Sequence, residues 1–459
     1  MSTNFRPVLR DMAMLLPPDL RDWVPEDDMV HFVIEAVERI PLSENDFVVN
    51  RRGTGSAQYH PKMMLALLIY CYANGIFSSR KIERATYVNV SVRYLTADTH
   101  PDHDTICAFR RRNFDAFAKA FLHVLELATE MGVLKVGTIS VDGTQIDANA
   151  SKSKNVRHDR AEQLEKMLRA DIDELMKKAE AADGDDSDDG GSLPEEIARR
   201  ERLLEKMERA QANLRKRADQ RHAAELAEFE RKTERYQERQ RKGRRGARKP
   251  QEPVNKGPKP TDQSNLTDDD SRLMRKNRRA EFRQAYNAQT AVDVEGSQLV
   301  LSAHVSNCAS DAGELEPAIE GIDPSLGRPG AALVDSGYQN VEAIERVQAS
   351  GVEVYISTGA EDGNNDRRYD FRPPKKRKSR GTKDKRIRAM QEKMKTEEAR
   401  RLYRLRKQTV EPVFGIVKSV MGFHRFLLRG LEKATTEWRL VMLAYNVKRL
   451  YALRGAIEG

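Results

Sequence analysis

The chain has 459 residues, of which 39% are hydrophobic and 33% are charged, and its formal net charge is +9. Such a chain can bury a sizeable core in about two to three domains, and its basic surplus favours a polyanionic partner, since Lys and Arg that neutralise phosphates release counterions. A basic protein without such a partner is the alternative. Three scattered cysteines, no long apolar run and no signal-peptide pattern argue against a disulfide scaffold, a zinc site and a membrane protein.

Short helices are predicted over residues 1–135. Residues 27–40 place their apolar side chains on one helical face, and residues 61–75 begin with Pro and end with Gly, as helices prefer. The sequence therefore predicts an all-α N-terminal domain.

An arginine cluster lies near the start of a further predicted helix, for which Asp104 or Thr105 is the candidate N-cap. A compact helical module with such a cluster is typical of a helix-turn-helix-like DNA reader. The candidate DNA contacts are Arg110, Arg111 and Arg112. A solvated face of an ordinary helical domain is the alternative.

The hydrophobic period then changes from helical to strand-like. Alternating, β-branched runs bounded by Gly, Asp or Asn lie at residues 136–146, 284–294, 298–306, 331–338 and 352–358. A hairpin-length loop centred on Gly296 joins the second run to the third. Helical patterns separate the later runs and fill the C-terminus, so the residues predict an α/β domain built from 136–151 and 283–459.

Residues 152–282 interrupt this sheet. They contain two charged helical patterns on either side of the acidic segment DGDDSDDGGSLP, followed by a run rich in Lys, Arg, Gly and Pro at 241–262. The thin apolar stripes of the helices predict an antiparallel helical hairpin or coiled coil that projects from the core. We expect the basic run to be disordered unless phosphate orders it.

Two predicted strands end in an aspartate. In ISVDGTQI, Asp142 precedes the bend at Gly143, and in ALVDSGY an apolar run leads into Asp335. A carboxylate in this position is exposed at the end of a rigid strand, and two of them in one sheet can converge at a cleft. The alternative for each is an ordinary turn residue, since strands often end in Asp-Gly turns.

A third acidic residue, Glu411, stands beside a buried-face pattern in the C-terminal helical region, with Lys418 two helical turns further on. Pro412 removes a backbone donor, so the helix either kinks here or begins near Thr409, which would place Glu411 in the first turn. An ordinary exposed helix position is the alternative.

Together these segments resemble the DDE transposases of bacterial insertion sequences. The resemblance rests on VDGTQI, YNAQTAVD, LVDSGY, TVEPVFGIVK and GFHRFLLRGLEKATTEWRLVMLAYNVKRL, and the first ~130 residues resemble the family's helical N-terminal domain. It implies an RNase H-like mixed sheet with flanking helices. The implied activity is metal-dependent DNA strand cleavage and strand transfer at the ends of an insertion sequence.

By the family pattern, Asp142, Asp335 and Glu411 form the catalytic and metal-binding triad. Carboxylates without a His or Cys cluster suit hard divalent cations, here two Mg²⁺ ions with Mn²⁺ as a substitute. Such ions activate a nucleophile and stabilise the leaving oxygen of a phosphodiester. Asp147 and Asp293 are further carboxylates that rank lower because of their positions after a turn and within a hairpin.

The family's Tyr-x2-Arg-x3-Glu-x6-Lys signature is kept in part. Glu411 and Lys418 match it, whereas the nearest Arg and Tyr of this chain, Arg406 and Tyr403, each stand one position early. Lys418, Arg406 and Tyr403 are the further DNA contacts that the resemblance implies.

The implied partners are double-stranded DNA, at element ends and at the target, and a second copy of the chain in a synaptic complex. The implied location is the bacterial cytoplasm, in association with the nucleoid. Two other functions stay open: another RNase H-like nuclease or resolvase, and a DNA-binding coiled-coil protein without catalysis. The basic run PPKKRKSRGTKDKR at 373–386 is interpreted as a phosphate-contacting loop.

Overall fold

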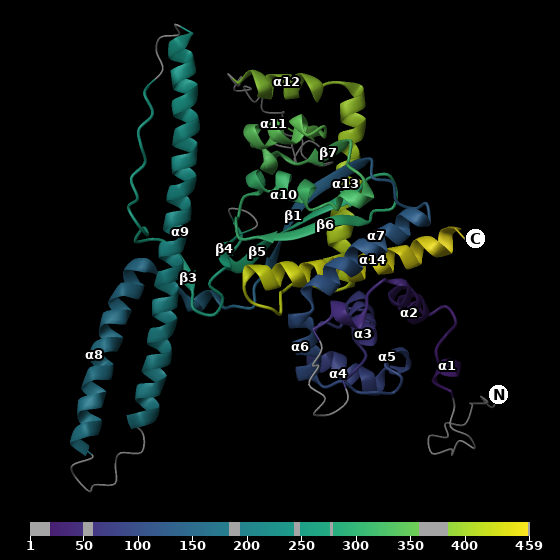
Figure 1. The fold of residues 1–459 in the computed structure, drawn as a ribbon, viewed down its shortest axis with the longest axis horizontal. Helices are drawn as coiled ribbons and strands as arrows, with labels where there is room; N and C mark the ends of the chain where they lie inside the picture. Colours follow the sequence, from purple (N-terminus) through teal and green to yellow (C-terminus); the bar gives the residue numbers. More distant parts are fainter. Residues whose placement is uncertain are drawn as a thin grey trace, which may run out of the picture.

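The computed structural model describes residues 19–48, 58–182, 193–242, 248–275, 279–357 and 384–457. Figure 1 shows a helical N-terminal part, a mixed sheet with flanking helices, and a long helical arm beside them. This is the mixed α/β, RNase H-like architecture that the sequence predicts. Most of the basic run at 373–386 lies outside the described residues. No helix within the described ranges is long and apolar enough to cross a membrane.

The N-terminal part packs its helices around α3, which is apolar on nearly every side and almost entirely buried between α2 and the C-terminal helix α14. Asp28 caps α2, and Asp102 caps α6 by accepting a hydrogen bond from Thr105 N (2.7 Å), so the cap of α6 precedes both predicted candidates. The helices are α1 (Leu20–Trp23), α2 (Met29–Arg39), α3 (Pro61–Ala73), α4 (Ser79–Val88), α5 (Val90–Leu95), α6 (His103–Arg112) and α7 (Phe114–Glu130).

The main sheet has the strand order β6–β5–β1–β7–β8, and the short strand β4 also pairs with β5. β5 runs antiparallel to β1 and forms the predicted hairpin with β6, whereas β1, β7 and β8 are parallel. Each of the five predicted runs forms a strand of this sheet. β4 is a further strand that the sequence did not predict. The strands are β1 (Thr138–Asp147), β4 (Arg272–Met274), β5 (Arg283–Asp293), β6 (Val300–Ser306), β7 (Ala331–Val334) and β8 (Glu353–Ile356).

Helices cover the sheet and connect it to the N-terminal part. α13 packs against β1, β5, β7 and β8, and α14 packs against β6 as well as α3 and α7. A single hydrophobic core therefore continues from the N-terminal helices through α14 into the sheet. The later helices are α10 (Leu315–Glu320), α11 (Val341–Ala349), α12 (Lys385–Lys393), α13 (Glu397–Gly415) and α14 (Leu431–Ile457).

α13 continues through Pro412 and passes into a π-helical turn at Ile416–Val420, so Glu411 does not lie in a first helical turn. A proline cannot donate to the carbonyl four residues before it. Here that carbonyl, Gln408 O, accepts a hydrogen bond from Gln298 Nε2 (3.0 Å) at the β5–β6 hairpin. The helix thus tolerates its proline because a neighbouring loop supplies the missing donor.

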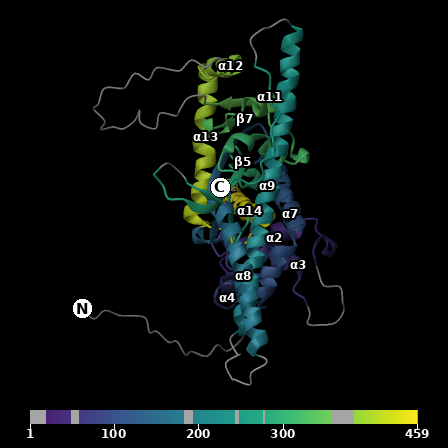
Figure 2. The same ribbon diagram turned by 90° about the vertical axis from the view of Figure 1, so that its left-hand side faces the viewer.

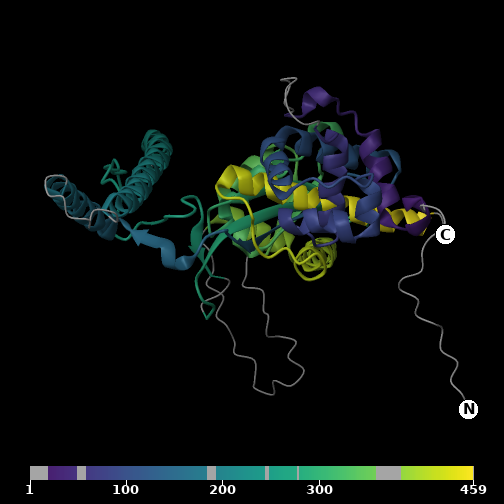
Figure 3. The same cartoon turned by 90° about the horizontal axis from the view of Figure 1, so that it is seen from below.

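The arm begins at a two-stranded ladder of β2 (Asn155–Arg157) and β3 (Gln263–Asn265). α8 (His158–Ala182) and α9 (Leu193–Arg241) lie side by side (Figure 2) and stand away from the body (Figure 3). Between them they bury a small cluster that includes Leu168 and Met207. This is a helical hairpin of the predicted kind. The run after α9 departs from the expectation of disorder, because residues 248–262 are placed along α9 and Arg221 pairs with Asp262 (3.0 Å).

Candidate active site

Asp142 and Asp335 lie at neighbouring positions in adjacent parallel strands. Val141 of β1 is in register with Val334, the last residue of β7, and Asp335 follows it. Asp142 differs from the prediction, because β1 continues through Asp142 and Gly143 to Asp147 in its pairing with β5, so Asp142 lies within the strand and not at its end. The Asp335 side chain caps the turn that follows by accepting a hydrogen bond from Gly337 N (2.6 Å). The sheet thus brings these two predicted residues together, as the parallel pairing of their strands requires.

Asp142 has less positive charge around it than a buried carboxylate normally needs. Its Oδ1 accepts a hydrogen bond from Gly143 N (2.9 Å), and its Oδ2 lies 3.4 Å from Arg406 Nη1. Burial, together with the nearby charges of Asp335 and Asp311, raises the pKa of Asp142 to about 7 although Arg406 opposes the shift. A group of this kind readily exchanges a proton for a metal cation.

Asp311 is an acidic residue of this region that the sequence analysis missed. Its Oδ1 accepts hydrogen bonds from Asn287 Nδ2 and Gln289 Nε2, both at 2.7 Å. A Cβ atom at Gly143 would lie 2.7 Å from that oxygen and 2.2 Å from Gln289 Nε2, so the glycine leaves room for this network. Asp311 stands in a polar loop, and its neighbourhood becomes apparent only when β5 is paired with β1.

The same network reaches the loop that carries Asp335. Tyr338, which is fully buried, donates from its hydroxyl to Gln289 Oε1. Burial raises the pKa of Tyr338, and the charges of Asp311, Asp142 and Asp335 add to the effect. The phenol therefore stays a donor, and the turn after Asp335 is fixed to β5.

Three of the predicted DNA contacts, Arg406, Tyr403 and Lys418, lie on α13 and the π-helical turn that follows it. The Arg406 side chain is 5% exposed beside Asp142, and its guanidinium lies 5.7 Å from the centre of the Tyr403 ring. Lys418 Nζ donates to Thr144 Oγ1 (2.5 Å) and Gln145 O (3.1 Å), both on β1. Lys418 and Arg406 are therefore placed next to β1, with Arg406 engaged by Asp142, whereas Tyr403 packs against a cluster that contains Leu333 of β7 and Tyr355 of β8.

Glu411 is exposed on α13 and is not among the charges that shift the pKa of Asp142. Five residues separate it from Arg406, which corresponds to about 140° around an α-helix. Within the part of the chain that the structure describes, no three His, Cys, Asp or Glu side chains are grouped closely enough to hold a metal. The donors that are present nevertheless fit a hard divalent cation, because Asp142 and Asp335 offer carboxylate oxygens in a region of excess negative charge.

The two lower-ranked carboxylates have local structural partners. Asp293 is buried at the start of the β5–β6 hairpin and accepts hydrogen bonds from Ser297 Oγ (2.6 Å) and Ser297 N (3.1 Å). Asp147 forms an ion pair with Arg283 (3.0 Å).

The three arginines of α6 occupy its last turn and not its start, and they differ in exposure. Arg110 is buried and donates to Tyr72 Oη (2.9 Å) and Phe77 O (3.0 Å), with Glu437 3.9 Å away. Such a side chain serves the interior of the protein, so the placement of Arg110 differs from that expected of a DNA contact. Arg111 and Arg112 are exposed.

The segment GFHRFLLRG links β1 to α14. Phe426 N donates to Asp147 O (2.8 Å), and Phe423 and Phe426 pack with Trp438 in a buried aromatic cluster. Glu437 Oε2 accepts from Leu427 N (2.8 Å) and Leu428 N (2.9 Å). The segment holds α14 against the end of β1, which is the strand that carries Asp142.

Two family models match the chain. Residues 253–447 match a transposase DDE domain, and residues 18–112 match a transposase domain of the type DUF772. The first match includes Asp335 and Glu411, whereas Asp142 lies between the two matches. Searches of curated proteins and of solved structures gave no significant match.

Proposed function

Because the chain belongs to the DDE-type transposases of insertion sequences, we propose that it cleaves DNA strands at element ends and transfers those ends to a target, with divalent metal ions as cofactors. The observation that carries this proposal is the convergence of Asp142 and Asp335 where the parallel pairing of β1 and β7 ends, with the pKa of Asp142 raised to about 7. A site that holds excess negative charge is suited to bind cations that activate phosphodiester chemistry.

In this proposal Asp142, Asp335 and Glu411 hold two Mg²⁺ ions, for which Mn²⁺ can substitute. When bound, the ions supply Lewis acidity to the attacking and leaving oxygens of an in-line displacement. Glu411 contributes from α13, the helix that also brings Arg406 to Asp142 (3.4 Å). Arg406 keeps the Asp142 side chain oriented, and its positive charge offsets part of the negative charge of the site when no cation is bound.

DNA contacts in this proposal come from several elements. Tyr403 packs beside Arg406, Lys418 lies beside β1, and Arg111 and Arg112 are exposed at the end of α6. Cationic side chains of this kind bind the phosphate backbone and position it over the carboxylates. The protein acts as a homodimer in the synaptic complex, in the bacterial cytoplasm and in association with the nucleoid.

The test uses a labelled duplex that ends in the inverted repeat flanking the gene, together with a supercoiled target plasmid. We expect nicked ends and joined products in Mg²⁺ or Mn²⁺, and neither in EDTA. Cleavage without joining would favour the alternative of an RNase H-like nuclease or resolvase. Binding without cleavage in either metal would contradict the proposed activity and favour a non-catalytic DNA-binding protein.

A further inference from the structure

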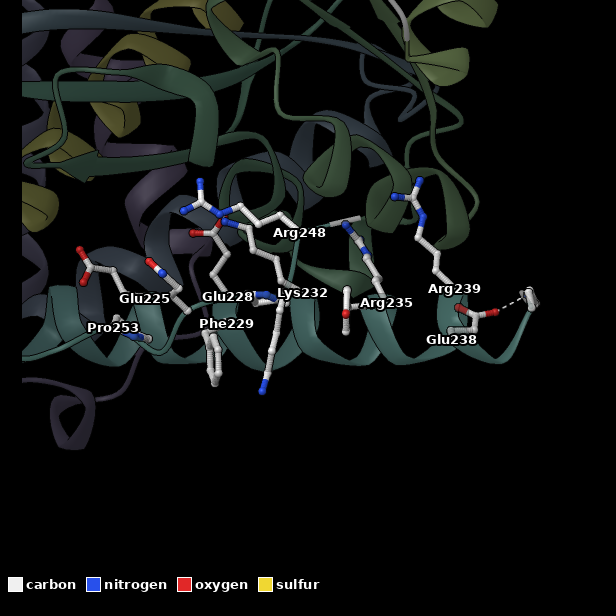
Figure 4. Close-up of a pocket in the computed structure, with 14 residues that line it drawn as sticks. Glu225, Glu228, Phe229, Lys232, Arg235, Glu238, Arg239, Arg248 and Pro253 are labelled. Carbon is white, nitrogen blue, oxygen red and sulfur yellow. Dashed lines mark hydrogen bonds and ion pairs between the residues drawn. The ribbon is translucent and has the colours of Figure 1, made fainter. Parts of the chain in front are cut away.

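A groove runs along the arm, between the second half of α9 and the segment that returns beside it. It has a volume of about 810 Å³ and is lined by residues from Glu225 to Lys242 and from Arg248 to Pro253 (Figure 4). We call it the arm groove. Phe229 and Tyr236 stand two helical turns apart among its lining residues, and Pro250 and Pro253 come from the returning segment.

The charge of the arm groove is predominantly positive. Its described lining contains six Lys and Arg residues and three Glu residues. Lys232 and Lys242 are paired with glutamates of α9 at 2.6 and 2.5 Å, and these exposed pairs contribute little binding energy of their own. Arg235 is paired with Glu342. Among the described residues, no carboxylate forms an ion pair with the remaining three cations of the groove, which are Arg239, Arg248 and Lys249.

The cations are spaced for a row of phosphates. Arg235 and Arg239, four residues apart, share one face of α9, and Lys242 continues this spacing one residue beyond the end of the helix, so the row is about 10 Å long. Successive phosphates of one DNA strand advance by about 3.4 Å along the duplex axis, so this length matches about three phosphates. Figure 4 shows Arg235, Arg239 and Arg248 pointing to the same side of the helix.

That side of α9 faces the domain that carries the carboxylates. Arg231 and Arg235 form ion pairs with Glu342 of α11 at 2.8 and 3.2 Å. α11 begins six residues after Asp335, directly behind the turn that Asp335 caps. A polyanion held in the arm groove would therefore lie on the side of the arm that faces the sheet.

We propose that the arm groove binds the sugar–phosphate backbone of double-stranded DNA without regard to base sequence. The residues point to phosphate because six cationic side chains and a single amide, Gln251, line the groove, and Lys and Arg are the usual partners of phosphate oxygens. The site is separate from the carboxylates and from α6. The identity of the duplex as transposition substrate rests on the proposed function, but binding itself does not require cleavage.

The test compares two charge-reversal variants of the full-length chain. The groove variant carries Arg239→Glu, Arg248→Glu and Lys249→Glu. The control variant carries Arg202→Glu, Lys206→Glu and Arg215→Glu, which change the net charge equally at exposed positions of the same helix outside the groove. Affinity for a fluorescent duplex of about 30 base pairs, or three helical turns, is measured by anisotropy from about 50 to 200 mM salt. One duplex carries the element end and another has an unrelated sequence.

We expect the groove variant to bind both duplexes more than about tenfold more weakly at the higher salt concentration, and its slope of log affinity against log salt to be smaller by about two to three. The control variant should keep the wild-type slope within about one. Equal slopes for the two variants would overturn the proposal, and so would a loss confined to the element-end duplex. Since binding is read without metal and without cleavage, an inactive wild type would contradict the proposed function and leave this result intact.

Discussion

Arg110 pairs with Glu437 where the N-terminal helices meet α14, and Arg406 pairs with Asp142 in the middle of β1. Both arginines are almost fully buried, and burial raises the pKa of both carboxylates. At Glu437, Arg110 and three hydrogen-bond donors oppose that effect. At Asp142, Arg406 and one backbone donor oppose it, but two further carboxylates reinforce it.

The difference separates a structural ion pair from a functional one. A buried carboxylate whose oxygens are all engaged stabilises one packing arrangement, and removing its partner leaves an uncompensated charge. A buried carboxylate with excess negative charge around it costs stability in the empty protein and gains it when a cation binds. By this reasoning we interpret the Arg110–Glu437 pair as structural, and we propose that the Arg406–Asp142 pair serves the reaction.

The largest expected effect follows substitution of the three carboxylates that we propose as metal ligands. Replacing Asp142, Asp335 or Glu411 by Ala should lower metal-dependent cleavage by more than about a thousandfold, because the missing carboxylate withdraws several kcal/mol of transition-state stabilisation. DNA affinity should stay near that of the wild type. Cleavage is followed by single-turnover kinetics, and affinity by anisotropy without metal.

Asp311→Ala serves as the matched comparison for this series. Because Asp311 Oδ1 is engaged by two side-chain amides, we expect a positioning role and a smaller loss than at Asp142. If Glu411→Ala cleaves within about tenfold of wild type while Asp311→Ala does not, Asp311 replaces Glu411 in the triad.

Substitution in the Arg110–Glu437 pair should lower the free energy of unfolding and leave the cleavage chemistry unchanged. Arg110→Met removes the cation beside Glu437, and breaking a buried pair in this way costs about 3–5 kcal/mol. Urea unfolding measures the loss. Arg111→Met, an exposed neighbour, should change stability by no more than about 0.5 kcal/mol. Equal stability of the two variants would contradict the structural assignment of Arg110.

For DNA binding, we expect the exposed arginines of α6 to matter more than the buried Arg110. The double variant Arg111→Glu, Arg112→Glu should weaken binding and reduce the salt slope by about two, because it removes two exposed cations. An unchanged slope would show that the end of α6 does not contact DNA.

A smaller effect is expected in the pH dependence of stability. The pKa of Asp142 is about 7 in the folded chain, against an ordinary value of 3.8. Between these values the folded state binds more protons than the unfolded state, so the contribution of Asp142 makes stability fall as pH rises through this window. Asp142→Asn should remove that fall, and urea midpoints at about pH 5 and about pH 7.5 measure it.

Mg²⁺ provides an independent check on the same group. Added Mg²⁺ should raise the unfolding midpoint of the wild type near neutral pH more than that of Asp142→Asn, because the cation takes the place of the proton. Arg406→Met keeps the carboxylate but removes its partner, and should retain the response to Mg²⁺. An equal response in wild type and Asp142→Asn would separate Asp142 from the cation site.

The sheet could be predicted well because its strands are long enough to show their period. β1, β5 and β6 each have seven or more residues, and the closeness of Asp142 and Asp335 follows from the parallel pairing of β1 with β7. β4 has only three residues in a polar stretch, too few to show a period. It forms a strand because β5 is available beside it.

The side-chain environments could not be predicted, because they depend on partners that are distant in sequence. Arg110 is buried by Tyr72 and Glu437, which belong to other helices. Asp311 joins the site through Asn287 and Gln289 of β5. The local sequence shows an arginine cluster and a polar loop. Only the folded structure shows that Arg110 of the cluster is buried and that Asp311 of the loop lies near Asp142 and Asp335.

The arm offers the last comparison, between a segment attached to the sheet and the sheet itself. The predicted arm spans residues 152–282, but β4 pairs with β5, and Asp268 accepts hydrogen bonds from Tyr286 Oη (2.8 Å) and Gly430 N (3.2 Å). Residues after β3 therefore support the strand that flanks β1. A deletion that tests the arm must leave them in place.

His158 N donates to Asp262 O (2.9 Å), so the two ends of the arm lie close together. Replacing residues 159–261 by a short Gly/Ser linker should keep β2 paired with β3 and the sheet intact. At saturating DNA we expect single-end nicking within a few-fold of wild type, because the carboxylates and α13 are untouched. We also expect a fall in paired-end complexes, because we propose that the arm helps to assemble them. Nicking is measured on a labelled end and pairing by native gel electrophoresis. Loss of nicking in a variant that unfolds with the cooperativity of the wild type would show that the arm supplies part of the active site.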